Sequence, residues 1–300
     1  MRYFLRTSQI VLAMAFISTT LMAEEQAAQP PILESQAALQ KRLDDPALRL
    51  LDTRPEAEYA KGHIPGAVWI DTKAIHEMTK TPAAFQNRGM WEKWIAPLGI
   101  GRDTEVLIVD GKRQLDSARL WGLLRYLGVK KVGLVNGNFP LWEKDGRPVT
   151  TDVPRVEPKP FPVAFRGGRY ASREDVLSAI KSGKTRVVDA RSVEEYTGEK
   201  KSSKRGGHIP AACHLEWTEL VDQDGRFLDD AALKAKLTAL GVKPGEAVIT
   251  HCQGGGRASV DAFAIERLGI PTSNYYVGWS DWGNAEDTPV VEGAEPTAKP

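Results

Sequence analysis

The stretch LLDTRPEAEYAKGHIPGA at residues 50–67 returns as VVDARSVEEYTGEKKSSKRGGHIPAA at residues 187–212. Both copies contain D-x-R-x-x-x-E-Y and end on G-H-I-P, and the second carries eight additional residues between these two blocks. Further along, LGIGRDTEVLIVD is matched in the same order by LGVKPGEAVITH. Ordered matches of this length predict a duplicated domain. The eight additional residues, rich in lysine, serine and glycine, predict a solvated loop.

The duplication sets the domain organisation that we expect for the 300 residues. Repeat one is expected at 33–150 and repeat two at 169–294. Between them, residues 151–168 hold four prolines and show little periodicity. Such a composition predicts an extended linker, which we expect to pack across both repeats.

Within each repeat, short apolar runs alternate with helical patterns. We expect buried strands at 48–53, 104–110, 185–190 and 246–251. Residues 116–128 and 258–269 carry apolar residues at helical spacing and end at glycine, which is a common helix stop. This alternation predicts an α/β fold in which each repeat has a mostly parallel sheet flanked by helices. The working site of such a sheet lies beyond the carboxyl ends of its strands.

The N-terminal segment has the pattern of a secretory signal peptide. Two arginines precede an unbroken apolar run at 10–17, and Ala23 precedes two acids. The apolar run is too short to span a bilayer stably. We therefore expect a signal peptide at 1–23 and an exported protein, in a bacterial periplasm. A mitochondrial presequence is the alternative, because no acid occurs before Glu24.

Charge and ligand spacing exclude several classes of partner. The net charge of +1 provides no basic field for nucleic acid to follow. The cysteine and histidine pairs at 213–214 and 251–252 have no standard metal-ligand spacing. We expect no metal, no cofactor, no membrane contact after signal removal, and a monomer.

The stretch THCQGGGRAS at 250–259 places Cys252 at the end of an apolar run, directly before a helical pattern. The three following glycines allow positive φ and let successive N–H groups point to one centre, to which the helix adds its dipole. A thiol at this place is expected to be largely thiolate near neutral pH. These features predict that Cys252 is a nucleophile and that backbone amides hold the resulting anion. The expected binding loop consists of Gln253, Gly254, Gly255, Gly256 and Arg257, whose fixed charge suits an anionic substrate.

Two other interpretations of this loop have to be weighed. Cys252 could form a disulfide with Cys213, the only other cysteine, but we expect Cys213 to be buried on a strand and both thiols to be free. The loops of cysteine phosphatases also begin His-Cys and end in arginine, yet they need five residues in between, and here four intervene. An ungapped alignment of the repeats places Gly111 opposite Cys252. We therefore predict one catalytic domain and one thiol-free partner domain.

The tandem blocks, the loop from Cys252 to Arg257, and YVGWSDW at 276–282 resemble the rhodanese family. Both repeats are similar to the two-domain thiosulfate and 3-mercaptopyruvate sulfurtransferases, in which only the second domain bears the cysteine. The resemblance implies two tandem rhodanese-like doubly wound α/β domains and a persulfide on Cys252. A small anionic donor would supply sulfane sulfur, which would pass to cyanide or a thiol acceptor. The loop CQGGGR is closest to bacterial rhodanese loops, which favours thiosulfate over 3-mercaptopyruvate as the donor.

Glu195 stands where vertebrate members of the family place a substrate-binding arginine. The remaining conspicuous residues are expected to be structural or to lie beside the site. This group comprises His63 and His208 at the turns, the ion pairs Asp52–Arg54 and Asp189–Arg191, His251 with its side chain directed away from the thiol, and Trp279 and Trp282 in the core or in the pocket wall. The alternative function class is a non-catalytic sulfur carrier, redox sensor or binding protein on the same fold.

Overall fold

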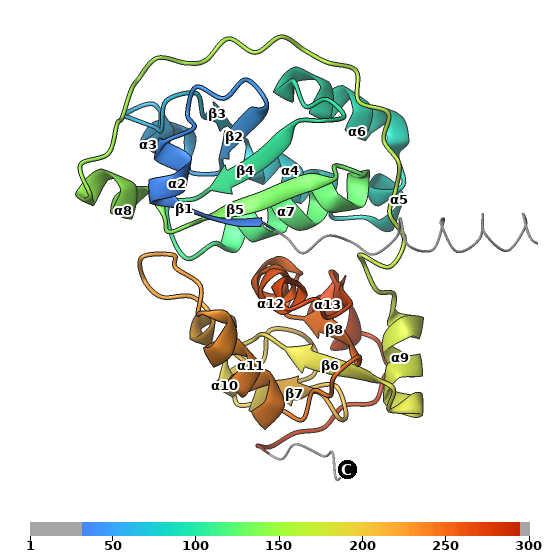
Figure 1. The fold of residues 1–300 in the computed structure, drawn as a ribbon. Helices are drawn as coiled ribbons and strands as arrows, with labels where there is room; N and C mark the ends of the chain where they lie inside the picture. Colours follow the sequence, from blue (N-terminus) through green and yellow to red (C-terminus); the bar gives the residue numbers. More distant parts are fainter. Residues whose placement is uncertain (1–31, 295–300) are drawn as a thin grey trace, which may run out of the picture. The chain divides into compact units, whose positions relative to one another are not determined.

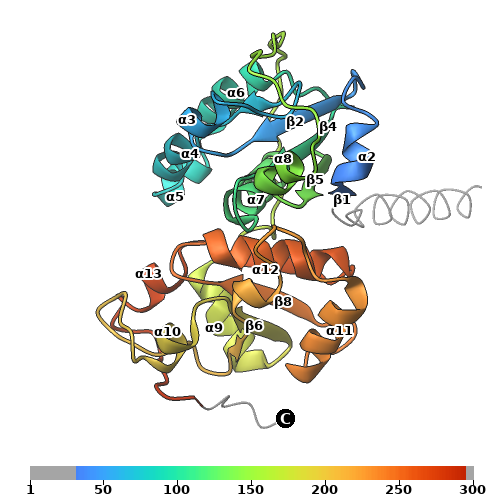
Figure 2. The same cartoon turned by 90° about the vertical axis from the view of Figure 1, so that its left-hand side faces the viewer.

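The computed structural model describes residues 32–294, and both repeats lie in one compact unit of the chain. The expected signal peptide at 1–23 lies outside the described residues. Each repeat is built on its own parallel sheet with helices on both sides (Figures 1 and 2). This arrangement confirms the predicted α/β fold.

The sheet of repeat one has the order β1-β5-β4-β2-β3, and all its pairings are parallel. Its strands are β1 (Ile32–Ser35), β2 (Leu48–Asp52), β3 (Val68–Trp69), β4 (Glu105–Val109) and β5 (Lys131–Asn136). The two strands predicted from the sequence, β2 and β4, form the centre of this sheet next to β5. Central parallel strands are buried on both faces, which explains why their apolar runs are the ones visible in the sequence.

The sheet of repeat two has the order β7-β6-β8-β9 and is also parallel. Its strands are β6 (Thr185–Asp189), β7 (Cys213–His214), β8 (Ala247–His251) and β9 (Thr272–Tyr275). Read from β9, this order repeats the order β5-β4-β2-β3 of repeat one. A single parallel bridge between Tyr170 and Asn274 stands beside β9, where repeat one has β1.

The helices of repeat one are α2 (Gln36–Gln40), α3 (Glu56–Tyr59), α4 (Thr72–Met78), α5 (Pro82–Phe85), α6 (Arg88–Ile95), the 3-10 turn η1 (Ala96–Leu98), α7 (Leu115–Leu127) and α8 (Phe139–Lys144). Those of repeat two are α9 (Arg173–Ser182), α10 (Val193–Thr197), η2 (Trp217–Glu219), α11 (Asp230–Ala239), α12 (Gly256–Arg267) and α13 (Gly278–Trp282). The two predicted helices are α7 and α12. Helix α7 ends at Gly128, whose φ of 102° is left-handed, as the glycine stop predicted.

Alternation along the strands divides the core of each repeat between the two faces of its sheet. In repeat one, Leu50 and Leu107 face α2, α3 and α8, while Leu51 and Ile108 face α6 and α7. The second of these layers continues into repeat two, because α7 packs against α12. Trp121 of α7 and Phe263 of α12 meet edge to face, with ring centroids 5.1 Å apart. The two repeats therefore share one hydrophobic layer.

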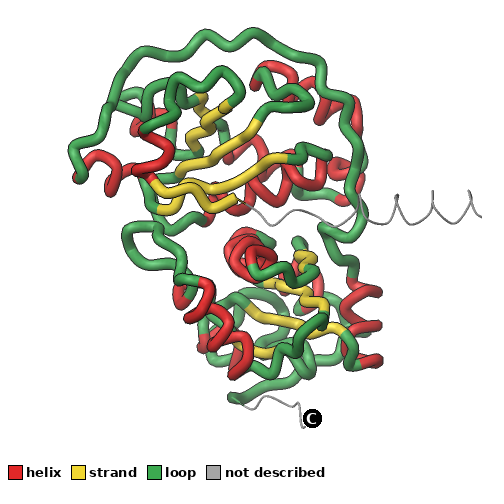
Figure 3. The backbone as a smooth tube through the Cα atoms, in the orientation of Figure 1, coloured by secondary structure: helices red, strands yellow, loops and turns green. Residues whose placement is uncertain are grey.

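Residues 151–166 contain no helix or strand and run as a long extended segment, drawn as loop in Figure 3. Backbone N–H groups of Lys159 and Ala164 donate to the carbonyls of Ala96 and Leu127 in repeat one. Within the described part of the chain, backbone bonds to repeat two begin only at Arg169. The expected extended segment is present, and its backbone packs on repeat one rather than across both. None of the described helices is long and apolar enough to cross a membrane.

Candidate active site

Cys252 lies where β8 ends and the loop into α12 begins, at the carboxyl edge of the second sheet. Both cysteines are buried and free. Cys213 is on β7, and β6 separates that strand from β8. At about 4.8 Å per strand spacing, the two Cα atoms are roughly 10 Å apart or more. A disulfide needs about 7 Å or less, so the sheet keeps the two thiols apart as expected.

The surroundings of the two thiols differ more than their burial does. The Cys213 thiol donates to the carbonyl of Leu240, with Sγ and O 3.3 Å apart. Burial raises the pKa of Cys213, and only the nearby Arg186 opposes the shift. This thiol therefore stays protonated near neutral pH and behaves as a small core residue.

The loop around Cys252 has its backbone acceptors occupied and its donors open. The carbonyls of Cys252 and Gln253 accept from the N–H groups of Trp279 and Ser280 at the start of α13, over 2.7 and 3.0 Å. The Gly255 carbonyl accepts from the Ser259 N–H and hydroxyl and from the Asn274 side chain. Within residues 32–294, no acceptor binds the N–H groups of residues 253, 254 and 255. Successive unpaired N–H groups in such a loop are able to bind an anion.

The three loop glycines differ in their backbone conformation and in what an added side chain would meet. Of the three, only Gly255 has a positive φ, 77°. The expected use of positive φ is therefore confirmed for Gly255 but not for Gly254 or Gly256. An added Cβ at Gly255 would collide with the ring of Tyr276, and one at Gly256 would collide with the guanidinium of Arg119. An added Cβ at Gly254 would meet nothing within 4 Å, so the loop is open on that side.

Repeat one provides an internal comparison that corrects the ungapped alignment. The carbonyl of Val109 accepts a hydrogen bond from Thr53 N–H, and the carbonyl of His251 accepts the equivalent bond from Ala190 N–H. One residue further on, the carbonyls of Asp110 and Cys252 accept from the N–H groups of Phe139 and Trp279. Asp110 rather than Gly111 therefore occupies the place of Cys252. The alignment failed because the loop before α7 is one residue longer than the loop before α12.

The Asp110 carboxylate shows what this loop geometry binds. Oδ1 accepts from the backbone N–H of Lys112 over 3.0 Å, and the N–H of Gln114 also bonds to this side chain. Burial is the main cause that raises the pKa of Asp110 to about 6, and these two hydrogen bonds oppose it. At neutral pH the group is therefore ionised. Repeat one fills its own loop with an anion, whereas in repeat two the same donors remain open beside a thiol.

Arg257 is not the unpaired cation that the sequence suggested. Its guanidinium forms two hydrogen bonds to the carboxylate of Glu195, with Nη1–Oε2 and Nη2–Oε1 distances of 2.5 and 3.1 Å. Burial opposes ionisation of Glu195, but the bonds and charge of Arg257 outweigh it and lower the pKa of Glu195 to about 2. The charges of Arg257 and Glu195, the two residues expected to influence how an anionic substrate binds, thus neutralise each other.

Gln253 contacts the eight-residue insertion, which is not a purely solvated loop. Its side-chain amide donates to the carbonyl of Ser202 and the hydroxyl of Ser203, over 3.1 and 3.2 Å. The Ser203 hydroxyl in turn donates to the carbonyl of Trp279, and Arg205 donates to the carbonyl of Thr288. The lysines of the insertion are exposed, as its composition predicted, but the serines fasten it to the loop that bears Cys252.

The repeated D-x-R and G-H-I-P blocks form the same buttress in both repeats. In repeat two, Arg191 binds the Asp189 carboxylate and donates to the carbonyl of Gly207. The ring of His208 stacks on Tyr196, with centroids 3.8 Å apart, and hydrogen-bonds to the Tyr196 carbonyl. Repeat one has equivalent contacts at residues 52, 54, 59 and 63. These contacts agree with the structural roles expected for the blocks.

His251 and the two late tryptophans belong to the core. His251 is fully buried, and Nε2 faces the Asp189 carboxylate at 3.5 Å. Burial is the main cause that lowers the pKa of His251 to about 4, so the ring is neutral. Trp279 and Trp282 are both 0% exposed, which decides between core and pocket wall in favour of the core.

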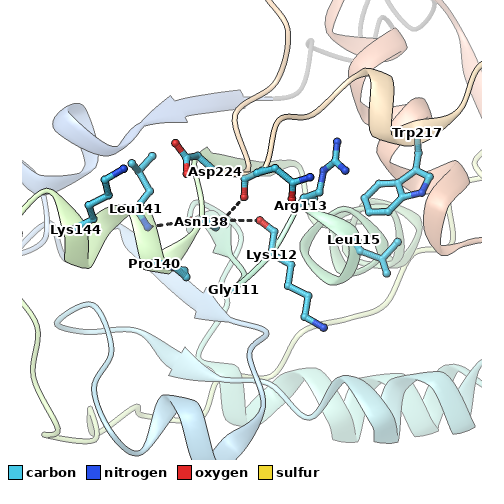
Figure 4. Close-up of a pocket in the computed structure, with 11 residues that line it drawn as sticks. Gly111, Lys112, Arg113, Leu115, Asn138, Pro140, Leu141, Lys144, Trp217 and Asp224 are labelled. Atoms are coloured by element: carbon cyan, nitrogen blue, oxygen red, sulfur yellow. Dashed lines mark hydrogen bonds between the residues drawn. The ribbon is translucent and has the colours of Figure 1, made fainter.

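A cavity of about 440 Å³ lies at the repeat-one loop, not at Cys252 (Figure 4). Lys112 and Lys144 line it from repeat one, and Trp217 and Asp224 line it from repeat two. The Asn138 amide donates to the carbonyls of Lys112 and Gln223, so this side chain joins the two repeats here. Because the Asp110 carboxylate occupies the adjacent loop, the cavity lacks a reactive group.

Arg119 is the residue near the site that reasoning from the sequence missed. It projects from α7 of repeat one against Gly256 of the loop that bears Cys252. In the sequence it is one polar residue within a helical pattern, and nothing local marks it. Its position depends on the packing of α7 against α12.

Residues 35–145 and 172–285 each match the family described as the rhodanese-like domain. The thiosulfate sulfurtransferase of Azotobacter vinelandii is 32% identical over 262 residues, covering 87% of this chain and 97% of that protein. The sulfur carrier protein TtuD of Thermus thermophilus is 34% identical over 283 residues, covering 89% and 99%. The crystal structure of SseA from Escherichia coli superposes with a TM-score of 0.72 at 27% identity, covering 83% and 99%. The chain belongs to the rhodanese family.

Proposed function

We propose that Cys252 accepts sulfane sulfur from a small anionic donor as a persulfide and passes it to cyanide or a thiol. The chain is a sulfurtransferase, in agreement with the thiosulfate and 3-mercaptopyruvate sulfurtransferases among its relatives. One observation carries the assignment to Cys252. The loop that follows this thiol has open N–H groups, and in repeat one N–H groups of the equivalent loop bind the carboxylate of Asp110. An anion on Cys252 would receive the same hydrogen bonds.

The chemistry that this loop would support is a pair of sulfur transfers. With thiosulfate, the Cys252 thiolate attacks the outer sulfur, a new S–S bond forms, and the old S–S bond breaks with its electrons leaving on sulfite. The product is a persulfide anion, and the preorganised N–H groups would stabilise it without reorganisation. Cyanide or a thiolate then takes the outer sulfur and restores the Cys252 thiolate. No external oxidant or reductant is needed.

The other loop residues have distinct proposed roles. The backbone N–H groups of Gln253, Gly254 and Gly255 would bind the persulfide anion, and the open side at Gly254 would admit the donor. Gly256 begins α12, whose dipole favours the same charge. Burial opposes the charge of Arg257, but its hydrogen bonds with Glu195 and then its proximity to Cys252 raise its pKa. Thiosulfate is the preferred donor, which agrees with the name of the Azotobacter relative.

Mass spectrometry of the protein treated with thiosulfate, without an acceptor, tests this assignment. One sulfur, about 32 Da, should be found on the peptide that contains Cys252. Cys252→Ser should abolish both the adduct and thiocyanate formation. Cys213→Ser, which removes the other thiol, should leave most of the activity. An adduct on Cys213, or activity that survives Cys252→Ser, would disprove the proposal.

A sulfur carrier is the second candidate, because TtuD bears that name and covers nearly the whole chain. A carrier would load Cys252 once and release the sulfur only to a specific protein. An enzyme would form many equivalents of thiocyanate per protein molecule with excess thiosulfate and cyanide. Turnover that stops at one equivalent would favour the carrier.

We also propose that residues 1–23 direct export and that repeat one, the linker and repeat two occupy 33–150, 151–168 and 169–294. The two arginines and the apolar run at 10–17 support the first part. N-terminal sequencing of the protein from its native cell should show a chain that begins near Glu24. A mature chain that still begins at Met1 would contradict export.

A further inference from the structure

The charge balance around Cys252 leaves the donor without an obvious partner. Thiosulfate carries two negative charges and the thiolate a third, and the attack brings all three together. Like charges at such distances repel strongly in a partly buried site. Arg257 and Arg191 are both next to this site, but each is bound to its own carboxylate, Glu195 and Asp189. Neither has an uncommitted charge to offer.

Arg119 of repeat one is different. Within the described ranges of the chain, no carboxylate lies within 4.0 Å of its guanidinium. Nη1 bonds to Nδ1 of His76 over 3.1 Å, and Nε is buried without a partner. Burial, and then the charge of Arg119, lower the pKa of His76, so the imidazole is neutral and can accept this bond. Asp116, one turn earlier on α7, interacts with this charge through space but forms no ion pair with it, so the guanidinium has no bonded anion.

The backbone of the loop is shaped around this guanidinium. A Cβ at Gly256 would overlap Nη2 of Arg119, and its distances to Cζ and Nε would be 3.1 and 3.2 Å. The Nη2 end of the guanidinium therefore makes the nearest approach to Gly256, which ends the loop that bears Cys252. A partly buried arginine that has lost water without gaining a carboxylate is a costly arrangement unless an anion completes it.

Arg113, near the start of α7, is the other arginine to consider. Its Nε and Nη2 donate to the carbonyls of Val221 and Thr218, and its guanidinium lies 5.5 Å from the ring centroid of Trp217. Its donors are thus spent on holding the two repeats together. Arg119 has no comparable structural task.

We propose that Arg119, supplied by repeat one, binds the anionic group of the sulfur donor at the loop of repeat two. The planar fork of a guanidinium matches the oxygens of a sulfonate or carboxylate. The outer sulfur of thiosulfate would face Cys252, and its oxyanion end would lie against Arg119. The thiol-free repeat thereby completes the active site. This inference rests on the proposed role of Cys252.

Direct binding measurements test whether Arg119 binds the donor independently of sulfur transfer to Cys252. Calorimetric titration of thiosulfate into the Cys252→Ser protein gives a dissociation constant without turnover. Adding Arg119→Gln, which keeps the stem but removes the charge, should weaken binding roughly 10- to 100-fold, as the loss of one charge-assisted hydrogen bond does. Arg119→Lys keeps the charge without the fork and should weaken binding several-fold.

Arg125→Ala is the matched control. Arg125 lies on the same helix and also faces α12, but it is paired with Glu266, with Nη2 and Oε1 3.5 Å apart. Its removal should leave the dissociation constant within two-fold of the parent. In the enzyme with Cys252 intact, Arg119→Gln should raise KM for thiosulfate, while the preloaded persulfide should react with uncharged dithiothreitol at the parental rate.

An unchanged dissociation constant in Arg119→Gln would overturn the inference. If that variant does not fold, Arg119→Lys decides alone, and unchanged binding there has the same consequence. Failure of the Cys252 assignment would look different, because the sulfur adduct would then be absent from Cys252 or present on another residue.

Discussion

Asp110 and Cys252 occupy equivalent positions in the two repeats, and their comparison shows the effect of a single side chain. Both directly follow a strand inside their sheet, β4 or β8, and their carbonyls accept from N–H groups at the start of α8 and α13, respectively. The surrounding donors bind a carboxylate in one repeat and stay open in the other. The two loops therefore differ in the residue at this position, in addition to the one extra residue of the loop before α7.

The ionisation of Asp110 leads to a prediction about stability. Its folded pKa of about 6 lies above the ordinary value of 3.8, mainly because of burial. Well below pH 3.8 the group is neutral in both states. As pH rises to about 6, the unfolded chain ionises first, so the folded state loses stability. Asp110→Asn should therefore raise the free energy of unfolding at pH 7 to 8, by up to about 3 kcal/mol.

Urea denaturation at pH 4, 6 and 8 would measure this effect. The gain from Asp110→Asn should be small at pH 4 and largest above pH 6. Asp44→Asn, at an exposed position, is the control and should show no such trend. A loss of stability at pH 8 in Asp110→Asn would show that the bonds from Lys112 and Gln114 outweigh the cost of burying the charge.

At the scale of elements, three segments fix the conformation of the loop that bears Cys252. Helix α13 takes the carbonyls of Cys252 and Gln253, so these point away from the thiol. Helix α12 begins at Gly256 and places its N-terminus beside the thiol. The third segment is the insertion around Ser202 and Ser203, which binds the side chain of Gln253. The loop is preorganised, which an anion-stabilising site requires.

A hairpin of repeat two, at residues 221–227, contacts the loop of repeat one that precedes α7. The turn at 222–225 follows η2, and its Gly225 carbonyl accepts from Gly137 N–H and from the Gln114 side chain. The Asp224 carbonyl accepts from the N–H of Asn138 over 2.7 Å. The hairpin of repeat two thus packs on the loop of repeat one. In the opposite direction, the hydroxyl of Thr79 in repeat one hydrogen-bonds to the hydroxyl of Tyr276 in repeat two. His76 of repeat one hydrogen-bonds to Arg119, which contacts the loop of repeat two.

At the scale of the whole molecule, the two repeats are joined by a shared hydrophobic layer and by these reciprocal contacts. Helices α7 and α12 each bury one face on their own sheet and another on each other. Such a layer cannot be divided without exposing both helices to water, at about 25 cal/mol for each Å² of apolar surface. We therefore expect the repeats to unfold together.

Gly225→Ala tests the contribution of the hairpin contact. Gly225 has a φ of 75°, and an added Cβ would lie 2.9 Å from both the Asn138 N and the Lys112 O of repeat one. Gly245→Ala is the matched control, because its φ is 78° and a Cβ there would meet nothing within 4 Å. The control should cost about 1 kcal/mol from backbone strain alone. Gly225→Ala should cost at least about 1 kcal/mol more, because a contact between the repeats must shift.

Chemical denaturation of both variants, followed by circular dichroism, gives the two free energies of unfolding. Equal losses in Gly225→Ala and Gly245→Ala would mean that the hairpin contact adds nothing to stability. A second transition in Gly225→Ala alone would show that this contact is what couples the two repeats.

Much of the fold could be predicted because its signals are local. Strands β2, β4, β6 and β8 are apolar on both faces, and α7 and α12 have helical periodicity, so their patterns are readable residue by residue. The outer strands β1 and β3 were not predicted, since they are short or partly exposed, whereas Cys213 was correctly expected on a strand, which is β7. The prediction that Cys252 is the nucleophile rests on equally local features, because the glycines and the helix follow it directly.

The sequence alone therefore determined the duplication, the parallel α/β architecture and the glycine-rich loop that follows Cys252 at the end of β8. Periodicity, turn residues and backbone freedom are properties of neighbouring residues. Tertiary structure decided how charge is distributed around that loop. Arg257 is neutralised by Glu195, 62 positions away, Asp110 takes the place of Cys252, and Arg119 reaches Gly256 from the other repeat. These relations exist only after the sheets have formed and α7 has packed on α12, since charges act through space and not along the chain.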